Sequence, residues 1–246
     1  MPDRFSAIRL GVVCPMANEE ATAAEFVAEV LRNVQPFGFA EVAFFAVLDN
    51  VSRDRTRELL MELAERHPEV RVVWAPENRA VADAYVRGYR EALEHGADWI
   101  LEIDAGFSHN PAEIPNLLRA MGDDTQCVFG TRFATGGENR GPKRRRAISY
   151  GGTILSRVLL GTRLSDMTSG FELFRRDALE EVLRRGIRSK GPFFQTEIKV
   201  YCRRMQVVEV PITYDAATHR VRASALWESL VNLSYLVRMR MSGRLT

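Results

Sequence analysis

The segment VAFFAVLD, residues 42–49, places a carboxylate directly after seven consecutive apolar residues. A short, continuous apolar run is typical of a strand that is buried on both faces of a sheet. The segments on either side, Glu19–Val34 and Asp54–Arg66, carry apolar residues at helical spacing. Strand and helix therefore alternate here, which indicates a parallel sheet covered by helices on both faces.

The same alternation extends in both directions along the chain. The other expected strands of this half are Ala7–Cys14, Val70–Trp74, Trp99–Ile103 and Gln126–Gly130. A helix is expected over Val81–His95, and another begins at Asn110, where Pro111 and the capping-box residue Glu113 follow the N-cap. We therefore expect an α/β fold, with a Rossmann-like, mostly parallel sheet.

The pattern changes after Phe133. Ala134–Arg146 is rich in Gly and Arg and is expected to be a mobile loop, followed by a second loop at Thr162–Gly170. Val207–Tyr214 alternates like a strand, and its proline predicts a position at the edge of the sheet. Further helices are expected at Ala147–Leu160, Gln195–Met205 and Leu226–Met241.

Composition limits the classes of protein that fit this pattern. The 246 residues suit one domain, and the formal net charge of +2 gives no indication of a nucleic-acid partner. The three cysteines form no C-x-x-C pair, so we expect reduced thiols in the cytoplasm. No apolar run approaches the ~18 residues of a membrane span, so we expect a chain that does not cross a membrane.

Asp49 and Asp104 each follow a predicted buried strand. Ligands of such sheets bind beyond the carboxyl ends of the strands, where a carboxylate can bind a ribose or base, or hold a divalent ion between two phosphates. The alternative is that each carboxylate caps a helix or a turn. The chain has no G-x-G-x-x-G after the first strand, no P-loop motif and no G-x-S-x-G, which argues against dinucleotide enzymes, P-loop enzymes and α/β-hydrolases.

Six short blocks then point to a family. In chain order they are PMANE (15–19), LDNVSRDRT (48–56), DAG (104–106), GTR (130–132), DMTSGF (166–171) and EVPITY (209–214). They resemble the P-x-x-N-E, V-D-D-x-S-x-D-x-T, D-x-D, G-S-R, D-x-x-S-G-F and E-V-P-I-x-F motifs of glycosyltransferase family 2, in the branch of the polyprenyl-phosphate (dolichyl-phosphate) mannose synthases. The resemblance runs from about Leu10 to Leu226.

The resemblance implies a single domain (1–246) with the GT-A fold that inverts the anomeric carbon of a GDP- or UDP-sugar. Residues 7–133 would bind the nucleotide sugar, and 134–225 would bind the acceptor, a polyprenyl phosphate. Nucleotide-sugar contacts would come from Pro15, Asn18, Glu19, Asp49, Asn50, Asp104 and Ala105. Acceptor contacts would come from Arg132, Arg145, Ser149 and Arg220. Asp104 and Arg132 would be the catalytic residues.

Several positions depart from the family pattern. The resemblance implies Mg²⁺ or Mn²⁺ at Asp104, but Gly106 replaces the second acid and Ser108 the nearby glutamine. Few protein oxygens remain for a metal ion, so we predict that nucleotide binding depends on a divalent metal less steeply than in relatives that have both acids. His109 stands beside a helix start and is interpreted as a cap or surface residue, or as a group that approaches the diphosphate.

Two basic or amphipathic features have more than one interpretation. Lys143–Arg146 is either a solvated basic loop or part of an anion site, since arginine suits a phosphate acceptor that needs no general base. Residues 226–246 are expected to form an amphipathic helix with an apolar stripe of Leu226, Leu230, Leu233 and Val237. That stripe either packs on the protein core or contacts lipid at the inner face of a membrane.

Two other functions stay open at this stage. One is a catalytically lapsed module that binds a nucleotide sugar or phospholipid, having lost the second acid. The other is a nucleotidyltransferase, which would be expected to show a glycine-rich basic loop after the first strand. The segment Pro15–Glu19 is not such a loop, and the intact DMTSGF block favours the glycosyltransferase.

Overall fold

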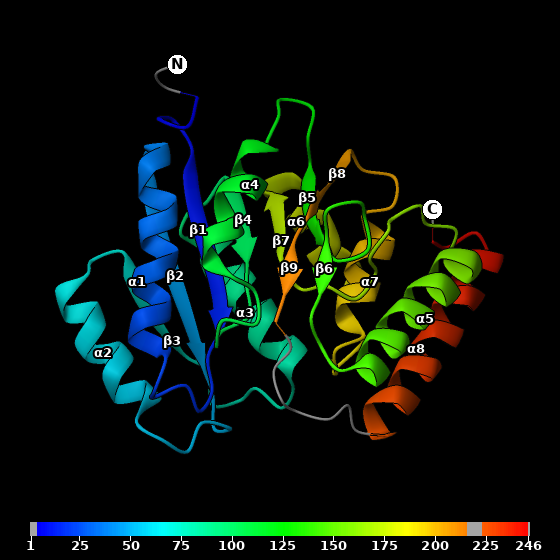
Figure 1. The fold of residues 1–246 in the computed structure, drawn as a ribbon, viewed down its shortest axis with the longest axis horizontal. Coiled ribbons are helices and arrows are strands. Elements are labelled where there is room, and N and C mark those ends of the chain that lie inside the picture. Colours follow the sequence, from blue (N-terminus) through cyan, green and yellow to red (C-terminus); the bar gives the residue numbers. More distant parts are fainter. Residues whose placement is uncertain (1–3, 216–222, 246) are drawn as a thin grey trace.

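The computed structural model describes residues 4–215 and 223–245, which build a seven-stranded sheet with helices on both faces (Figure 1). The strand order is β3-β2-β1-β4-β7-β5-β8, and β7 alone runs antiparallel to its two neighbours. The strands are β1 (Arg9–Pro15), β2 (Glu41–Leu48), β3 (Val70–Trp74), β4 (Trp99–Glu102), β5 (Cys127–Thr131), β7 (Glu172–Arg175) and β8 (Val207–Pro211). The expected mostly parallel α/β sheet is confirmed.

Alternate side chains of the central strands pack into two separate hydrophobic cores, one on each face of the sheet. Phe44 and Leu48 of β2 lie in one core with α1 (Ala23–Val34), α2 (Thr56–Arg66) and α4 (Ile114–Arg119). The other face is covered by α3 (Val81–Glu94), α6 (Arg176–Arg185) and α7 (Phe194–Tyr201). A continuous apolar strand therefore serves both faces, as the run VAFFAVL predicts.

Helix α3 packs unusually close to the sheet. A Cβ added at Gly88, in the middle of this helix, would overlap the Val13 side chain of β1. Glycine weakens a helix interior, and here it permits the close approach of helix and strand. This approach places Tyr85 and Tyr89 of α3 in the core beside the carboxyl end of β4.

The second half of the chain adds a smaller layer. Strands β6 (Glu138–Asn139) and β9 (Thr213–Tyr214) form a two-stranded parallel sheet. Helices α5 (Lys143–Leu160) and α8 (Ala223–Met241) lie side by side at one end of the molecule (Figure 1). No helix in the described residues is long and apolar enough to cross a membrane.

Several local expectations are wrong. The predicted loop Ala134–Arg146 contains β6, and its last four residues form the first turn of α5. The Glu113 carboxylate does not close a capping box, because it accepts hydrogen bonds from the backbone N–H of Thr213 at 2.9 and 3.1 Å. Asn110 does cap the short 3₁₀ turn η2 (Pro111–Glu113) by accepting from Ala112 N. Strand β7 and helix α6 were not expected at all.

Two carboxylates and one ammonium are fully buried where β4 and β7 meet. Glu102 of β4 and Glu172 of β7 stand opposite each other in the register. The Lys199 Nζ atom of α7 lies 2.8 Å from Glu172 Oε1 and donates to the carbonyl oxygen of Ser169 at 2.7 Å. The Lys199 ammonium therefore supplies a cation to one of the two acids, Glu172.

Burial raises the pKa of Glu102 well above its usual range, and the neighbouring Glu172 raises it further. Burial also raises the pKa of Glu172, to about 7, although the Lys199 ammonium opposes the shift. Glu102 accepts hydrogen bonds from the Tyr89 hydroxyl and the Gln195 amide. The cluster is thus stable only while its charges are shared or neutralised.

We expect Lys199→Met to lower the free energy of unfolding by about 3–5 kcal/mol, because it leaves the buried Glu172 without its cation. The matched control is Lys190→Met. Lys190 pairs with Asp83 at 2.7 Å, but its side chain is 62% exposed, so the loss should stay below about 1 kcal/mol. Chemical denaturation at pH 7 measures both values. Equal losses in the two variants would contradict this account of the cluster.

Candidate functional site

Parallel strands β1, β2 and β4 end at the same edge of the sheet. The two predicted acids, Asp49 and Asp104, lie at this edge. Asp49 follows β2 directly, and Asp104 lies two residues beyond β4. Strand β1 separates these two strands, so the acids share an edge but are not neighbours. The Asp49 carboxylate accepts from Val51 N at 2.8 Å and so shapes its own turn.

The loops after β1 and β2 are tied together by hydrogen bonds. Asn18, with a left-handed φ of 60°, accepts from Arg53 N at 2.9 Å through its side-chain oxygen, and its own N–H donates to Ser52 Oγ. The Glu19 N–H donates to Thr56 Oγ1 at 2.7 Å. Asn50 donates to the carbonyl oxygen of Pro76. The P-x-x-N-E block and the block after β2 therefore form one ordered surface.

Asp54 connects this surface to the start of α2. Desolvation raises the pKa of its carboxyl, but hydrogen bonds from Thr56, Glu20 and Ser52 outweigh that effect and lower the pKa to about 2. The carboxylate accepts from Thr56 N at 3.1 Å at the start of α2 and from Glu20 N at 3.0 Å. The surface is thus pre-organised before any ligand arrives.

A cavity of about 520 Å³ opens beside Asp104. Its polar end is lined by Asp104, His109, Arg132, Arg145, Ser149 and Tyr214. Its apolar walls come mainly from α5, α8 and the start of α7, with Ile148, Leu155, Phe193, Leu226, Leu230 and Leu233 among them. Four of the predicted site residues thus meet in one cavity. The remaining described ones, Pro15, Asn18, Glu19, Asp49, Asn50 and Ala105, lie at the same sheet edge outside its lining.

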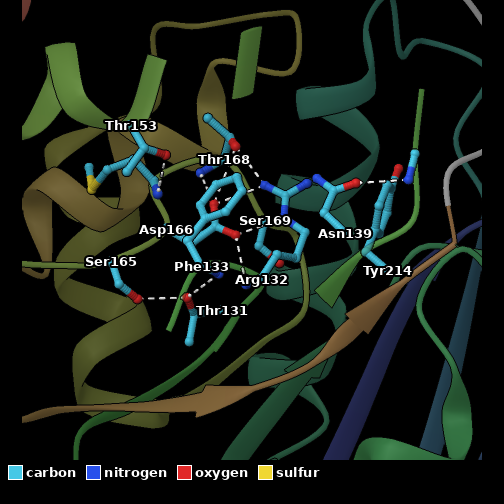
Figure 2. Close-up of polar contacts among 12 residues, drawn as sticks. Thr131, Arg132, Phe133, Asn139, Thr153, Ser165, Asp166, Thr168, Ser169 and Tyr214 are labelled. Carbon is cyan, nitrogen blue, oxygen red and sulfur yellow. Dashed lines mark hydrogen bonds and ion pairs between the residues drawn. The ribbon is translucent and has the colours of Figure 1, made fainter. Parts of the chain in front are cut away.

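Arg132 is held at the floor of the cavity by Asp166 (Figure 2). Its Nε and Nη2 atoms donate to the two carboxylate oxygens at 2.7 and 2.8 Å, and Nη2 also donates to Thr168 Oγ1 at 2.6 Å. Burial opposes ionisation of Asp166, but the Arg132 hydrogen bonds and charge hold the pKa of this carboxyl well below its usual range. Much of the Arg132 charge is therefore already balanced inside the protein.

Arg145 and Ser149 enter the cavity from α5, one helical turn apart. The Arg145 Nη2 atom donates to the Tyr214 hydroxyl at 2.9 Å. Lys143, Arg144 and Arg146 of the same turn are exposed and lie outside the lining. Three side chains of the basic cluster are thus solvated, and the fourth, Arg145, lines the cavity. The fourth residue of the predicted acceptor set, Arg220, lies outside the described residues.

Asp104 and His109 are neighbours in the lining of the cavity. The Tyr85 hydroxyl donates to Asp104 Oδ1, and Asp104 Oδ2 lies 3.4 Å from His109 Nδ1 at angles that make no hydrogen bond. His109 is 1% exposed, so its interpretation as a cap or surface residue is wrong. Burial lowers the pKa of His109 to about 4 against the opposing charge of Asp104, with Arg132 contributing to the decrease.

The described residues contain no cluster of three or more His, Cys, Asp and Glu that could hold a metal ion. Gly106, at the place of the family's second acid, has a left-handed φ of 75°. A Cβ there would stand 3.2 Å from both carboxylate oxygens of Glu19. Asp104 and His109 are therefore the candidate protein ligands at this position.

Sequence reasoning missed three residues that fix the positions of cavity side chains. Tyr85 orients Asp104, Tyr214 orients Arg145, and Asp166 holds Arg132. Asp166 lies in the DMTSGF block and Tyr214 in the EVPITY block, so the family motifs already marked both positions. Tyr85 lies in a helix whose aromatic spacing indicates only a core face.

Comparisons with known proteins point to one family. A protein-family model described as glycosyl transferase family 2 matches residues 11–183. The undecaprenyl-phosphate mannosyltransferase of Micrococcus luteus is 32% identical over 194 residues, covering 76% of this chain and 79% of that protein. The polyprenol monophosphomannose synthase of Mycolicibacterium smegmatis is 35% identical over 172 residues, covering 68% and 65%. The dolichol-phosphate mannosyltransferase of Pyrococcus furiosus is 29% identical over 210 residues, covering 84% and 56%.

A solved structure supports the fold. The glucosyl-3-phosphoglycerate synthase of Mycobacterium tuberculosis in complex with uridine diphosphate superimposes with a TM-score of 0.66 at 18% identity, covering 94% of this chain and 80% of that chain. The family model spans well over half of the sequence, and the Micrococcus luteus relative is 32% identical over 76% of it. The chain therefore belongs to glycosyl transferase family 2.

Proposed function

We propose that the protein transfers a sugar from a nucleoside diphosphate sugar to a polyprenyl phosphate, with inversion at the anomeric carbon. The observation that carries this proposal is the shape and chemistry of the cavity. One end is polar and holds arginines beside Asp104, and the walls leading away from it are apolar. An acceptor with an anionic head and a long hydrocarbon tail matches both parts. The names of the three relatives support the same substrate class and favour mannose as the sugar.

Chemistry at the polar end requires positioning more than proton transfer. A phosphate oxygen of the acceptor is already anionic, so it can attack the anomeric carbon while the bond to the leaving diphosphate breaks. Arg145 and Ser149 would bind this phosphate, because a guanidinium fork matches phosphate oxygens. Arg132, fixed by Asp166, would position it from below and contribute the remaining positive field.

Departure of the nucleoside diphosphate builds negative charge beside Asp104. A divalent ion, when bound, supplies Lewis-acid stabilisation of that charge. Asp104 Oδ2 and the unpartnered His109 Nδ1 fit such an ion. The ordered loops around Asn18, Glu19 and Asp49 would hold the nucleotide at the sheet edge.

The same substrate class predicts contact with the inner face of a membrane. Several apolar side chains of α5 and α8 are exposed, including Ile154 (44%), Val158 (72%), Trp227 (70%) and Leu230 (50%). The C-terminal stripe is divided: Leu233 is buried, whereas Leu226 and Leu230 are exposed and line the cavity wall. Helix α8 therefore supports both the protein core and an apolar surface.

A lapsed binding module is the second candidate, and Gly106 is the observation that favours it. Transfer assays separate the two. We expect labelled mannose from GDP-mannose, or glucose from UDP-glucose, to appear in the lipid phase when undecaprenyl phosphate is supplied. Binding of a donor without transfer, with either sugar and with Mn²⁺ or Mg²⁺ present, would favour the lapsed module instead.

Changing Arg145 to alanine should raise the KM for the lipid phosphate or lower kcat about tenfold or more, the loss expected for one charge-assisted contact to phosphate. Donor affinity should change little, because the proposal assigns Arg145 to the acceptor phosphate. Arg144→Ala is the matched control, since Arg144 is exposed on the same turn. A loss of donor affinity in R145A would assign this arginine to the leaving diphosphate.

The protein should sediment with anionic vesicles, less so as salt rises. The double variant Trp227→Ser, Leu230→Ser should weaken sedimentation strongly, because two large apolar side chains leave the interface. Met61→Ser controls for lost apolar surface: Met61 is 51% exposed on α2, across the molecule from α8 (Figure 1). Equal sedimentation of all three proteins would remove α8 from the membrane contact.

A further inference from the structure

We propose that His109 is a metal ligand that acts together with Asp104. In this role His109 takes the place of the family's second acid, whose position is occupied by Gly106. The consequence is a site that prefers Mn²⁺ and other imidazole-binding transition metals over Mg²⁺. This inference rests on the proposed function, because the remaining ligands would be oxygens of the donor diphosphate.

The first observation is an unsatisfied imidazole. His109 is 1% exposed, and neither ring nitrogen has a hydrogen-bond partner in the described part of the chain. Buried polar groups almost always have partners, so an orphaned pair of nitrogens at a cavity wall indicates a ligand that completes the site. His109 lines the cavity together with Asp104.

The second observation is the distance between the two candidate ligand atoms. His109 Nδ1 and Asp104 Oδ2 are 3.4 Å apart, which is long for a hydrogen bond. With bonds of about 2.1 Å to nitrogen and to oxygen, one ion would subtend roughly 110° between these atoms, within the range of common coordination geometries. The pair is therefore spaced for one shared cation.

Both side chains are held in place. The His109 ring packs against Phe171 and Tyr214, with centroids 5.3 and 5.1 Å away. The other oxygen of Asp104 accepts from the Tyr85 hydroxyl, which leaves Oδ2 directed at His109. A ligand pair fixed by its surroundings loses little freedom when it binds an ion.

Position 106 is poorly suited to an acid in this chain. Its φ of 75° disfavours any side chain, and a Cβ would stand 3.2 Å from the Glu19 oxygens. A carboxylate there would face like charge. Replacing it by a neutral imidazole nearby also changes selectivity, because Mg²⁺ requires oxygen ligands whereas transition metals accept nitrogen.

Direct measurement of Mn²⁺ binding tests this inference without an activity assay. The full chain is titrated with Mn²⁺ in the presence of GDP or UDP, and free Mn²⁺ is followed by its paramagnetic resonance signal. We expect Mn²⁺ to bind at least tenfold more tightly than Mg²⁺. His109→Ala should weaken Mn²⁺ at least tenfold and change Mg²⁺ much less.

The matched control is His95→Ala. His95 also contacts a carboxylate, with Nε2 2.6 Å from Glu41 Oε1, but Glu41 opens β2 at the opposite edge of the sheet. H95A should bind Mn²⁺ like the unaltered protein. Equal Mn²⁺ affinity of folded H109A and the unaltered protein would overturn the proposal.

A second readout covers the case in which H109A does not fold. Pulsed resonance on Mn²⁺ bound to the unaltered protein should show coupling to an imidazole nitrogen. Bound Mn²⁺ without nitrogen coupling, or no Mn²⁺ binding with either nucleotide, would overturn the inference. Sugar transfer without nitrogen coupling would refute only this ligand assignment. Nitrogen coupling without transfer to any lipid phosphate would refute only the proposed function.

Discussion

Strand β7 runs antiparallel between β4 and β5, so the chain enters it at the edge where its parallel neighbours end. The loop before β7, which carries Asp166 and Thr168, therefore lies beside the residues that follow β5. That is where Asp166 meets Arg132 in a two-point ion pair. The floor of the cavity depends on this reversal, because a parallel strand would begin at the other edge of the sheet.

The buried charges beneath the cavity connect stability to the site. Lys199 approaches Glu172 and donates to the carbonyl oxygen of Ser169, and Thr196 donates to that of Met167. Helix α7 thereby holds the loop that carries Asp166 from below. Charges in the interior are costly unless they are shared. In this protein, Lys199 is one of the buried charges, and it also holds the loop that fixes the position of Arg132.

The cavity joins two kinds of chemistry that come from different parts of the chain. Asp104 and His109 arrive from the end of the parallel strands, whereas Arg145 and the apolar walls arrive from α5 and α8. The two-stranded sheet of β6 and β9, and the hydrogen bond from Arg145 to the Tyr214 hydroxyl, connect these parts. The polar end and the apolar walls of the cavity are thus supplied by parts of the chain that pack separately.

The sequence by itself determined the first five strands, the helices between them and the carboxylates at the sheet edge, because these features are encoded in local apolar periodicity. The ordered motif blocks likewise indicated the family. The resemblance predicted donor or acceptor roles for Asp104, Arg132, Arg145 and Ser149, and the structure brings these four residues to one cavity. Only the tertiary structure decided the rest. A four-residue strand such as β7 is recognisable only from the strands that it pairs with, whose partner residues are 43 to 76 positions away in sequence. The burial of His109 likewise depends on Phe171 and Tyr214, because packing partners distant in sequence leave no trace in local periodicity.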